Sequence, residues 1–367
     1  MLSYTSAVKI ALDASPLTVS TGGIARYTAE LACALAREFR ENTYWLVADH
    51  AFPMPGCGSA GSETPVPANL HAGEPARGLV AKRWWSIGLS RELTRIGADL
   101  FHGTDFSVPY LPLRPSVMTI HDLSPWIQRD WQPDAARIRR RTAALLRARV
   151  PTMIATPSEA IRNAVIDRFQ WPADRIAVTP LAGSEHFRPI ACDQRTRPYF
   201  AFVGTLEPRK NIARLIEAWR EVRKTDDIDL FIAGRRRHEF PPVAEEPGLH
   251  LAGAIPDADL PALYSGALAV VYPSLYEGFG LPVLEAMQCG ALVVTSRDPA
   301  LAEVAGDAAL RVDDSDLAGT LAAIAAHPEA FREMRERAPA RAAQFSWSRT
   351  AKMTQEVYAE AIRIFQR

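Results

Sequence analysis

The chain has 367 residues, which is long for one domain and suits two. Lys and Arg together number 42, as do Asp and Glu, so the overall charge gives no indication of a nucleic-acid partner, and we expect none. Apolar residues make up 48% of the chain, enough for two cores, yet no apolar run approaches the roughly 20 residues of a membrane span.

The cysteine spacing and the N-terminal sequence indicate the cellular compartment in which the protein works. The spacing of the four cysteines matches neither a metal site nor a redox motif: Cys33, Cys57, Cys192 and Cys289. The N-terminus lacks the hydrophobic core of a signal peptide. Both features favour a cytoplasmic protein with reduced thiols.

Strand-like and helix-like segments alternate along the chain. We predict five strands in each half, at 8–12, 44–48, 99–102, 116–120 and 152–156, then at 199–203, 229–233, 249–253, 268–272 and 291–295. The clearest helical spacing covers 212–224, with Asn211 as its N-cap. Such alternation implies parallel sheets covered by helices on both faces, so we predict an α/β protein of two doubly wound domains.

Two segments rich in Gly and Pro interrupt this alternation. Residues 51–78 have little periodicity and are predicted to form a long loop, while 179–198 should connect the two domains. We place the domains at 1–185 and 199–348, with a linker at 186–198 and a C-terminal helix at 349–367 that packs back towards the first domain.

A strand, a glycine turn and a helix are predicted in the sequence YPSLYEGFGLPVLEA, residues 272–286. Gly278 and Gly280 permit backbone conformations and close approaches that a β-carbon would forbid. Peptide N–H groups at the start of the following helix would attract an anion. Glu277 and Glu285 bracket the turn, and carboxylates accept hydrogen bonds from hydroxyl pairs. The pattern suits a phosphate flanked by sugars; a tight turn with two solvated glutamates is the alternative.

A second turn of this kind is predicted in FVGTLEPRKN, residues 202–211. Gly204 follows a strand, and Arg209 and Lys210 precede a helix, where two cations favour a diphosphate. Solvated side chains before a helix are again the alternative. Because ligands of open α/β sheets bind beyond the carboxyl ends of the strands, one nucleotide diphosphate could touch both turns.

Taken together, these motifs resemble the family-four retaining glycosyltransferases of the GT-B fold, bacterial mannosyltransferases included. The resemblance covers most of the chain and is strongest at 199–306, where YPSLYEGFGLPVLEAMQCGALVVTS and EVAGDAAL follow the family pattern. It implies two Rossmann-like domains that face each other across a cleft. One departure is LAGSE at 181–185, where the family has Gly, an apolar residue and Asp near the hinge.

The resemblance also implies roles for the residues of the two turns. Glu277 would contact the donor sugar and Glu285 the ribose, while the two cations would hold the diphosphate. The implied donor-binding residues are Gly22, Gly23, Gly204, Arg209, Lys210, Glu277, Gly278, Phe279, Gly280, Leu281 and Glu285.

The first domain agrees with this assignment. Gly22 and Gly23 in STGGIARYTAEL, 20–31, form a turn into a helix but no complete G-x-G-x-x-G, which argues against a dinucleotide oxidoreductase. In TIHDLSPW, 119–126, His121 stands at a strand end beside Asp122, where the resemblance implies a catalytic histidine. A hydrogen-bonded core histidine is the alternative.

The implied reaction transfers a sugar from a nucleotide diphosphate sugar to a hydroxyl with retained anomeric configuration. Cations and helix dipoles would stabilise the leaving diphosphate. Front-face attack is what the resemblance implies, and Glu277 as a nucleophile is the alternative. With Arg209 and Lys210 as the cations at the predicted diphosphate site, we expect no cofactor and no divalent metal.

The donor and the acceptor are less constrained by the sequence. YEGFGLP together with Arg26 implies GDP-mannose, with UDP-glucose or UDP-N-acetylglucosamine as alternatives, and the acceptor would be a glycan or lipid-linked glycan in polysaccharide or glycolipid biosynthesis. A nucleotide-sugar epimerase and a catalytically silent sugar-nucleotide-binding protein are rivals. The intact glutamate, histidine and cations count against the silent protein.

Two basic segments raise the question of membrane contact. AKRWW, 81–85, places cations beside Trp84 and Trp85, and ARIRRRTAALLRAR, 136–149, carries six arginines and no acid. Basic and aromatic residues on a helix can dock on an anionic membrane, which would make the protein peripheral on the inner face of the cell membrane. Solvated helix faces, with both tryptophans packed inside or on a loop, are the alternative. The residues expected to share a basic face are Arg137, Arg140, Arg141 and Arg147.

Overall fold

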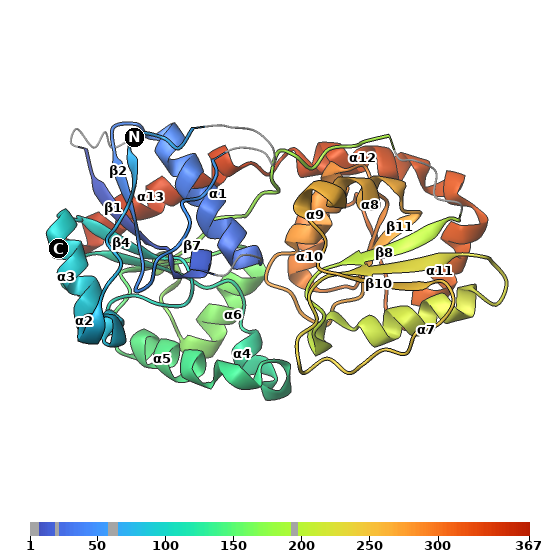
Figure 1. The fold of residues 1–367 in the computed structure, drawn as a ribbon, viewed down its shortest axis with the longest axis horizontal. Coiled ribbons are helices and arrows are strands. Elements are labelled where there is room, and N and C mark those ends of the chain that lie inside the picture. Colours follow the sequence, from blue (N-terminus) through green and yellow to red (C-terminus); the bar gives the residue numbers. More distant parts are fainter. Residues whose placement is uncertain (1–6, 19–21, 58–64, 192–196) are drawn as a thin grey trace. The chain divides into compact units, whose positions relative to one another are not determined.

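The computed structural model describes residues 7–18, 22–57, 65–191 and 197–367. Contacts divide the chain into two compact units (Figure 1). The first unit consists of Met1–Trp126, Asp134–Leu181 and Ser346–Arg367, and the second of Ile127–Pro133 and Ala182–Phe345. The C-terminal helix thus belongs to the first unit. The segment expected as a linker falls within the second unit, and its residues 192–196 lie outside the described residues.

The first unit is built on a parallel sheet, which in the described residues has seven strands in the order β3-β2-β1-β4-β5-β6-β7. Helices lie on both faces of this sheet, with α1 and α13 together on one of them (Figure 1). The strands are β1 (Lys9–Asp13), β2 (Thr43–Val47), β3 (Leu70–Ala72), β4 (Leu100–Gly103), β5 (Ser116–Thr119), β6 (Met153–Thr156) and β7 (Ile176–Val178). The α-helices are α1 (Gly23–Glu38), α2 (Gly78–Lys82), α3 (Leu89–Ile96), α4 (Ser124–Ile127), α5 (Ala136–Arg147), α6 (Glu159–Phe169) and α13 (Trp347–Phe365).

The second unit repeats this plan with a parallel sheet that has six described strands, in the order β10-β9-β8-β11-β12-β13. Helices α7 and α11 pack together, and α9 packs on α12 (Figure 1). The strands are β8 (Tyr199–Val203), β9 (Asp229–Ala233), β10 (Leu249–Gly253), β11 (Ala269–Tyr272), β12 (Val293–Thr295) and β13 (Leu310–Arg311). The helices are α7 (Ile212–Val222), α8 (Leu260–Gly266), α9 (Leu281–Gln288), α10 (Pro299–Ala305), α11 (Leu317–Ala326) and α12 (Arg332–Ala342).

Both sheets confirm the predicted parallel α/β class, and all ten predicted strands are present within one or two residues. Three short strands were not predicted. β3 lies inside the segment expected to be a loop, and β7 and β13 are the terminal strands of their sheets. Strands of two or three residues are too short to show a hydrophobic period, which explains why the sequence did not reveal them.

The cysteines differ from the expectation of reduced thiols. Cys33 on α1 and Cys57 form a disulfide, with their Cα atoms 5.4 Å apart. Because 24 positions separate the pair, their spacing resembles no short redox motif, and only the fold brings them together. Cys289 is buried and forms no disulfide, and Cys192 lies outside the described residues.

A buried polar network attaches α13 to the first sheet. The two ring nitrogens of His102 are hydrogen-bonded to the Tyr358 hydroxyl and to Thr119 Oγ1, each at 2.7 Å. Thr119 is also hydrogen-bonded to the Tyr27 hydroxyl on α1, at 2.9 Å. Burial and the nearby His121 lower the pKa of His102 to about 3, so this ring stays neutral. In the described part of the chain no helix, α13 included, is long and apolar enough to cross a bilayer.

We predict that Tyr358→Phe destabilises the first unit. The change removes a hydroxyl and leaves a buried ring nitrogen of His102 without its partner, which costs about 1–3 kcal/mol. Denaturant unfolding followed by circular dichroism measures this loss. The matched control is Lys352→Gln on the same helix, which breaks only an exposed ion pair with Glu38 and should cost less than about 1 kcal/mol. Equal effects of the two changes would contradict the prediction.

Candidate active site

The predicted donor site lies at the switch point of the second sheet, where strand order reverses between β8 and β11. Gly204 follows β8, and Arg209 and Lys210 lie in the short turn before α7. The turn after β11 leads into α9. A backbone hydrogen bond of 2.8 Å from Leu275 N to Arg209 O joins the two turns. The structure therefore brings the two sequence motifs together at the edge where ligands of doubly wound sheets bind.

Glu277 forms an ion pair with both predicted cations. Its Oε2 accepts a hydrogen bond of 2.9 Å from Arg209 Nη1, and its Oε1 accepts one of 2.5 Å from Lys210 Nζ. Arg209 also bonds the Tyr276 carbonyl at 2.9 Å and pairs with Glu207 at 2.7 Å. Glu207, Lys210 and Glu277 are buried. Two cations and two carboxylates thus form one compact cluster without a bound ligand.

The cluster keeps Glu277 ionised. Burial alone would raise the pKa of this carboxyl, but Lys210 and then Arg209 outweigh that effect and lower the pKa to about 2. An ionised carboxylate only accepts hydrogen bonds, so Glu277 is suited to bind hydroxyl donors such as those of a sugar.

Backbone donors surround the start of α9. Gly280 precedes the helix with φ of 102°, and a β-carbon there would lie 2.5 Å from Leu301 Cδ2, so the position requires glycine. Pro282 occupies the first helical turn, where its missing N–H costs no hydrogen bond. The N–H groups of Phe279, Gly280 and Leu281 donate to no acceptor in the described part of the chain. They are therefore available to an anion at this helix terminus.

Two predicted residues lie differently from what the sequence suggested. Glu285 is only 1% exposed, and its Oε2 accepts a hydrogen bond from the Tyr264 hydroxyl at 3.3 Å. Asn211 occupies the N-cap position of α7, but its side chain makes no cap hydrogen bond and bonds Asp314 instead. The predicted N-cap position of Asn211 is thus confirmed, although its side chain does not form the cap.

Sequence reasoning missed two neighbours of Glu277. Asp298 accepts hydrogen bonds from Glu277 N at 3.1 Å and from Leu301 N at 3.1 Å, and thereby fixes the turn against α10. Trp131 stacks on Tyr276, with ring centroids 6.2 Å apart. An Asp just before Pro is a recognisable cap signal for Asp298. No signal in the sequence could connect Trp131 with a residue so far along the chain.

In the first unit, the predicted glycine turn starts α1. Gly22 has φ of 144°, which disfavours any residue with a side chain, and a β-carbon on Gly22 or Gly23 would meet no atom within 4 Å. Ser20 and Thr21 of the same motif lie outside the described residues. Arg26 lies in the first turn of α1.

His121 follows β5 and is held from several sides. Its Nε2 lies 2.7 Å from the Thr104 carbonyl oxygen, and because a carbonyl only accepts, Nε2 carries the proton. Tyr27 packs edge-on against the ring, with centroids 4.8 Å apart. Burial lowers the pKa of His121, so the ring is neutral and Nδ1 is its acceptor atom. The adjacent Asp122 bonds Ser124 N at 2.8 Å and so fixes the following turn.

Two carboxyl groups that the sequence reading missed lie at the same sheet edge. Asp13 ends β1, and Asp105 follows β4, the neighbouring strand. Thr104 connects them to His121, because its hydroxyl bonds the Asp13 carbonyl at 2.7 Å. Asp105 Oδ1 is buried without a hydrogen-bond partner in the described chain. Burial raises the pKa of Asp13 to about 6 and that of Asp105 to about 7, where Asp13 adds to the effect.

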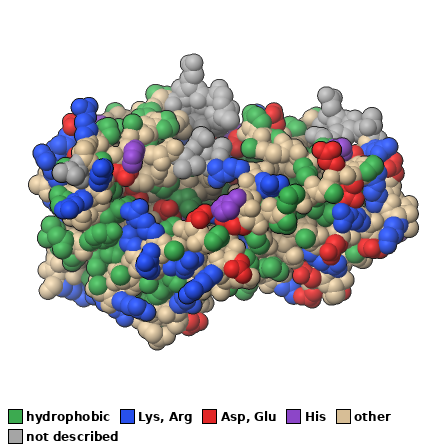
Figure 2. Space-filling model, turned by 60° about the horizontal axis from the view of Figure 1, so that its bottom comes forward, with side chains coloured by type: hydrophobic (Ala, Val, Ile, Leu, Met, Phe, Trp, Pro, Cys, Tyr) green, Lys and Arg blue, Asp and Glu red, His purple; other side chains and the backbone are tan. Residues whose placement is uncertain are grey.

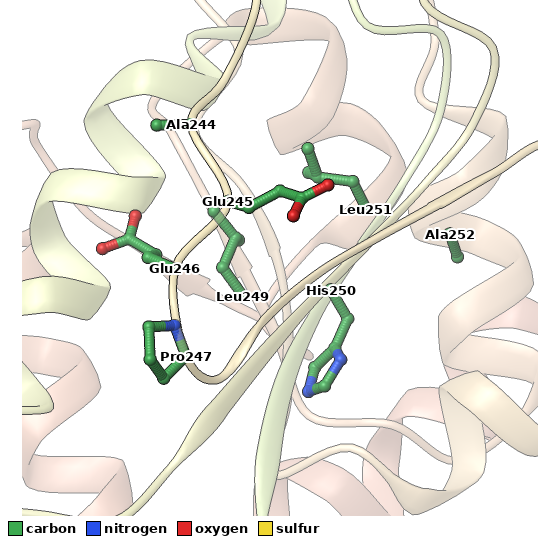
Figure 3. A pocket seen from close by; sticks show the side chains of 8 residues that line it. All are labelled: Ala244, Glu245, Glu246, Pro247, Leu249, His250, Leu251 and Ala252. Atoms are coloured by element: carbon green, nitrogen blue, oxygen red, sulfur yellow. The ribbon is translucent and has the colours of Figure 1, made fainter.

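A separate hollow of about 660 Å³ lies along β10, an edge strand of the second sheet. Figure 3 shows its lining, residues 244–247 and 249–252, with Glu245 and Leu251 on one side of the strand and His250 on the other. The segment between β9 and β10 contains no helix, so the edge strand stays exposed. None of the predicted site residues lines this hollow.

We predict that Asp105→Asn stabilises the protein at alkaline pH. Burial raises the pKa of Asp105 in the folded protein to about 7, above its ordinary value of 3.8, so the stabilisation from the protonated carboxyl is present below about pH 4 and lost as pH rises through 7. Asparagine cannot ionise, so the melting temperature of the variant should exceed that of the unmodified protein by roughly 2–4 °C at about pH 8 and by much less at about pH 5.

Differential scanning calorimetry at the two pH values measures this difference. The control Asp174→Asn removes an exposed carboxylate of the same unit and should leave the melting temperature unchanged at both. If the difference in melting temperature between Asp105→Asn and the unmodified protein does not grow with pH, the predicted cost of ionising Asp105 in the folded protein is refuted.

Two family models match the chain, one in each half. The model described as Glycosyltransferase Family 4 matches residues 21–182, and the model described as Glycosyl transferases group 1 matches residues 185–341. The first match contains the glycine turn and His121. The second contains the cation pair and both glutamates of the donor motif.

Relatives with assigned activities are similar over long stretches. The O-antigen chain mannosyltransferase B of Escherichia coli is 32% identical, over 96% of this chain and 99% of its own length. An MMP alpha-(1->4)-mannosyltransferase of Mycolicibacterium hassiacum is 30% identical over 58% of this chain and 55% of its own.

Solved structures of glycosyltransferases share the fold. Sucrose-phosphate synthase from Thermosynechococcus elongatus superposes with a TM-score of 0.71 at 21% identity, covering 96% of this chain and 98% of its own. WaaG, a glycosyltransferase of lipopolysaccharide biosynthesis, gives a TM-score of 0.67 at 15% identity, covering 95% and 99%. Two parallel-sheet units, both family matches and the full-length relative together show that the chain belongs to the family-four glycosyltransferases of the GT-B fold.

Proposed function

We propose that this glycosyltransferase transfers mannose from GDP-mannose, with retention of the anomeric configuration, to a hydroxyl of a glycan or lipid-linked glycan in polysaccharide or glycolipid biosynthesis. The single observation that supports it most is the cluster of Glu277 with Arg209 and Lys210 beside the start of α9. It combines an acceptor for sugar hydroxyls with cations and backbone donors for a diphosphate. The names of the mannosyltransferase relatives favour mannose as the sugar.

The leaving diphosphate dominates the proposed mechanism. As the bond to the sugar breaks, negative charge grows on the diphosphate, and Lys210, Arg209 and the N–H groups of α9 stabilise it. These groups are already in place, so little reorganisation is needed during the reaction. We propose that the two cations act where other enzymes use a divalent metal and that no cofactor is required.

The first unit would supply the acceptor side. Nδ1 of the neutral His121 can accept a hydrogen bond from a sugar hydroxyl, and Asp105 and Asp13 can accept others. Front-face attack, in which the leaving phosphate takes the proton of the acceptor hydroxyl, needs no enzymatic nucleophile. Because Arg209 and Lys210 occupy both oxygens of Glu277, that carboxylate is poorly placed to attack carbon itself.

A lipid-linked acceptor would bring the enzyme to a membrane. We therefore propose that the protein works in the cytoplasm, in peripheral contact with the inner face of the cell membrane. The basic face of α5 supports this, with one change from the sequence reading: Arg141 turns inward over the Trp85 ring, 4.9 Å from its centroid, while Arg137, Arg140 and Arg147 are exposed.

A donor screen tests the proposed function. The enzyme is incubated with GDP-mannose, UDP-glucose or UDP-N-acetylglucosamine and with mannose-terminated soluble or lipid-linked glycans, and nucleotide release and product are measured. We expect GDP release and an α-mannosylated product from GDP-mannose, undiminished by EDTA. Release of UDP without release of GDP would show that the donor is a UDP-sugar and not GDP-mannose. Activity that EDTA abolishes and Mg²⁺ restores would refute the metal-free mechanism.

Separate roles are predicted for the two glutamates of the donor motif. Glu277→Gln should abolish most transfer while leaving GDP affinity within a few-fold, because its partner is the sugar. Glu285→Gln should weaken binding of free GDP through the ribose. Calorimetric binding and turnover assays separate the two effects, and the opposite pattern would show that the roles are exchanged.

The burial of Glu285 calls for a control on its partner. Tyr264→Phe removes the hydroxyl that bonds Glu285 but keeps the carboxylate. If the carboxylate contacts ribose, Tyr264→Phe should retain most of the GDP affinity that Glu285→Gln loses. An equal loss from both changes would mean that Glu285 acts by positioning the helix and not by contact with the nucleotide.

A further inference from the structure

Four large apolar side chains are exposed close together on the first unit. Ile87, Tyr110, Leu111 and Leu113 are exposed by 51%, 40%, 56% and 64%. A hydrogen bond of 3.3 Å from Tyr110 N to Trp85 O joins the two segments that carry them. Leu111 and Leu113 lie over Ser90 and Leu93 of α3, with which they line a small cavity. We call these four residues the apolar tip.

The segments around the apolar tip are strongly basic. Residues 78–91, 106–120 and 135–158 contain ten Lys and Arg residues and no Asp or Glu, although the chain as a whole has no net charge. The Arg141 guanidinium stacks on Trp85, which places α5 beside the segment that carries Ile87. Figure 2 shows hydrophobic and basic side chains gathered together on the first unit.

Seven of these cations are exposed, and one of them, Arg149, bonds the Gln170 carbonyl and stacks on Trp171. The other six are Lys82, Arg83, Arg91, Arg137, Arg140 and Arg147. Within the residues that the structure describes, none of the six side chains forms an ion pair. In contrast, exposed arginines of the second unit, such as Arg297 and Arg332, pair with acidic neighbours. The basic charge around the apolar tip is thus uncompensated by the fold.

The apolar tip together with the six exposed cations around it favours one class of partner. Nucleic acid would match the cations but would leave the leucines in water. An apolar protein surface would cover the leucines but would bury cations without partners, which is unfavourable. An anionic bilayer matches both, because acyl chains take up apolar side chains while anionic headgroups attract Lys and Arg.

We propose that the apolar tip and the six surrounding cations form a docking surface for an anionic lipid bilayer. Ile87, Leu111 and Leu113 enter the boundary between headgroups and acyl chains, and the cations contact the headgroups. The contact is peripheral and reversible. Its biological purpose, access to a lipid-linked acceptor, rests on the proposed function, but binding itself requires neither donor nor acceptor.

Flotation of the full chain with vesicles tests the docking surface. Phosphatidylcholine vesicles with and without phosphatidylglycerol are compared at low and high salt, without any nucleotide sugar. We expect binding only to the anionic vesicles, weakened by salt. The basic variant Arg137→Gln/Arg140→Gln/Arg147→Gln should bind about a hundredfold more weakly at low salt, since each cation contributes about a factor of five.

The tip variant Leu111→Ser/Leu113→Ser separates insertion from charge attraction. It should bind anionic vesicles about tenfold more weakly at both salt concentrations, because loss of apolar contact is not screened by ions. The matched controls are Leu251→Ser and Arg297→Gln/Arg332→Gln/Arg337→Gln, exposed residues of the second unit, which should bind like the unmodified protein. Circular dichroism verifies that each variant is folded.

Three results would overturn the proposal. They are equal binding to both vesicle types or to neither, unchanged binding of the tip variant, and binding to an RNA oligonucleotide in place of vesicles. Because the assay contains no donor, its outcome is independent of the donor screen. A protein that binds vesicles but transfers no sugar would refute the proposed function and leave the docking surface intact.

Discussion

The ion pairs between Glu277 and the cations Arg209 and Lys210 join the two turns from which the donor site is built. Burying either charge alone would cost several kcal/mol, so the cluster forms as a unit or not at all. With Glu207 included, the cluster has no net charge before a ligand arrives. A diphosphate therefore meets cations that are already partly neutralised. Much of the selectivity for a sugar diphosphate over free phosphate must then come from two other sources. They are the N–H groups before and within α9 and the hydrogen bonds that Glu277 accepts from sugar hydroxyls.

The two units use the same sheet topology with opposite electrostatics. At the β8–β11 switch point, cations hold the pKa of Glu277 down and keep the site ionised. At the β1–β4 switch point, Asp13 and Asp105 lie in a region where burial raises both pKa values, so uncharged carboxyl groups are favoured at low pH. An ionised site suits a charged donor, and a site with hydrogen-bonding carboxyls and a neutral His121 suits a hydroxyl-bearing acceptor. The retention of a carboxyl with one buried, unpartnered oxygen, at a cost in stability, is typical of a functional position.

Local sequence patterns predicted the parts of the fold that have local causes. Strands with several apolar residues, the glycine turns and the Arg209–Lys210 pair follow from spacing and side-chain chemistry within about ten residues. Features that depend on distant contacts were not predictable. The Cys33–Cys57 disulfide, the stacking of Trp131 on Tyr276 and the burial of Glu285 by Tyr264 all require the completed fold. Asp105 could have been found by the rule that identified His121, since each follows a predicted strand that ends at the same sheet edge.

Helix α5 shows how one basic segment acquires two environments. Its arginines look equivalent in the sequence, but Arg141 stacks on the Trp85 ring and is only partly exposed, while Arg137, Arg140 and Arg147 are exposed. Burial raises the pKa of Asp13 and Asp105, and the Arg141 guanidinium is close enough to both carboxyls to offset part of that rise. Because Arg137 lies one turn before Arg141, α5 carries a proposed lipid contact and the guanidinium that acts on the acceptor-side carboxyls next to each other on one helix.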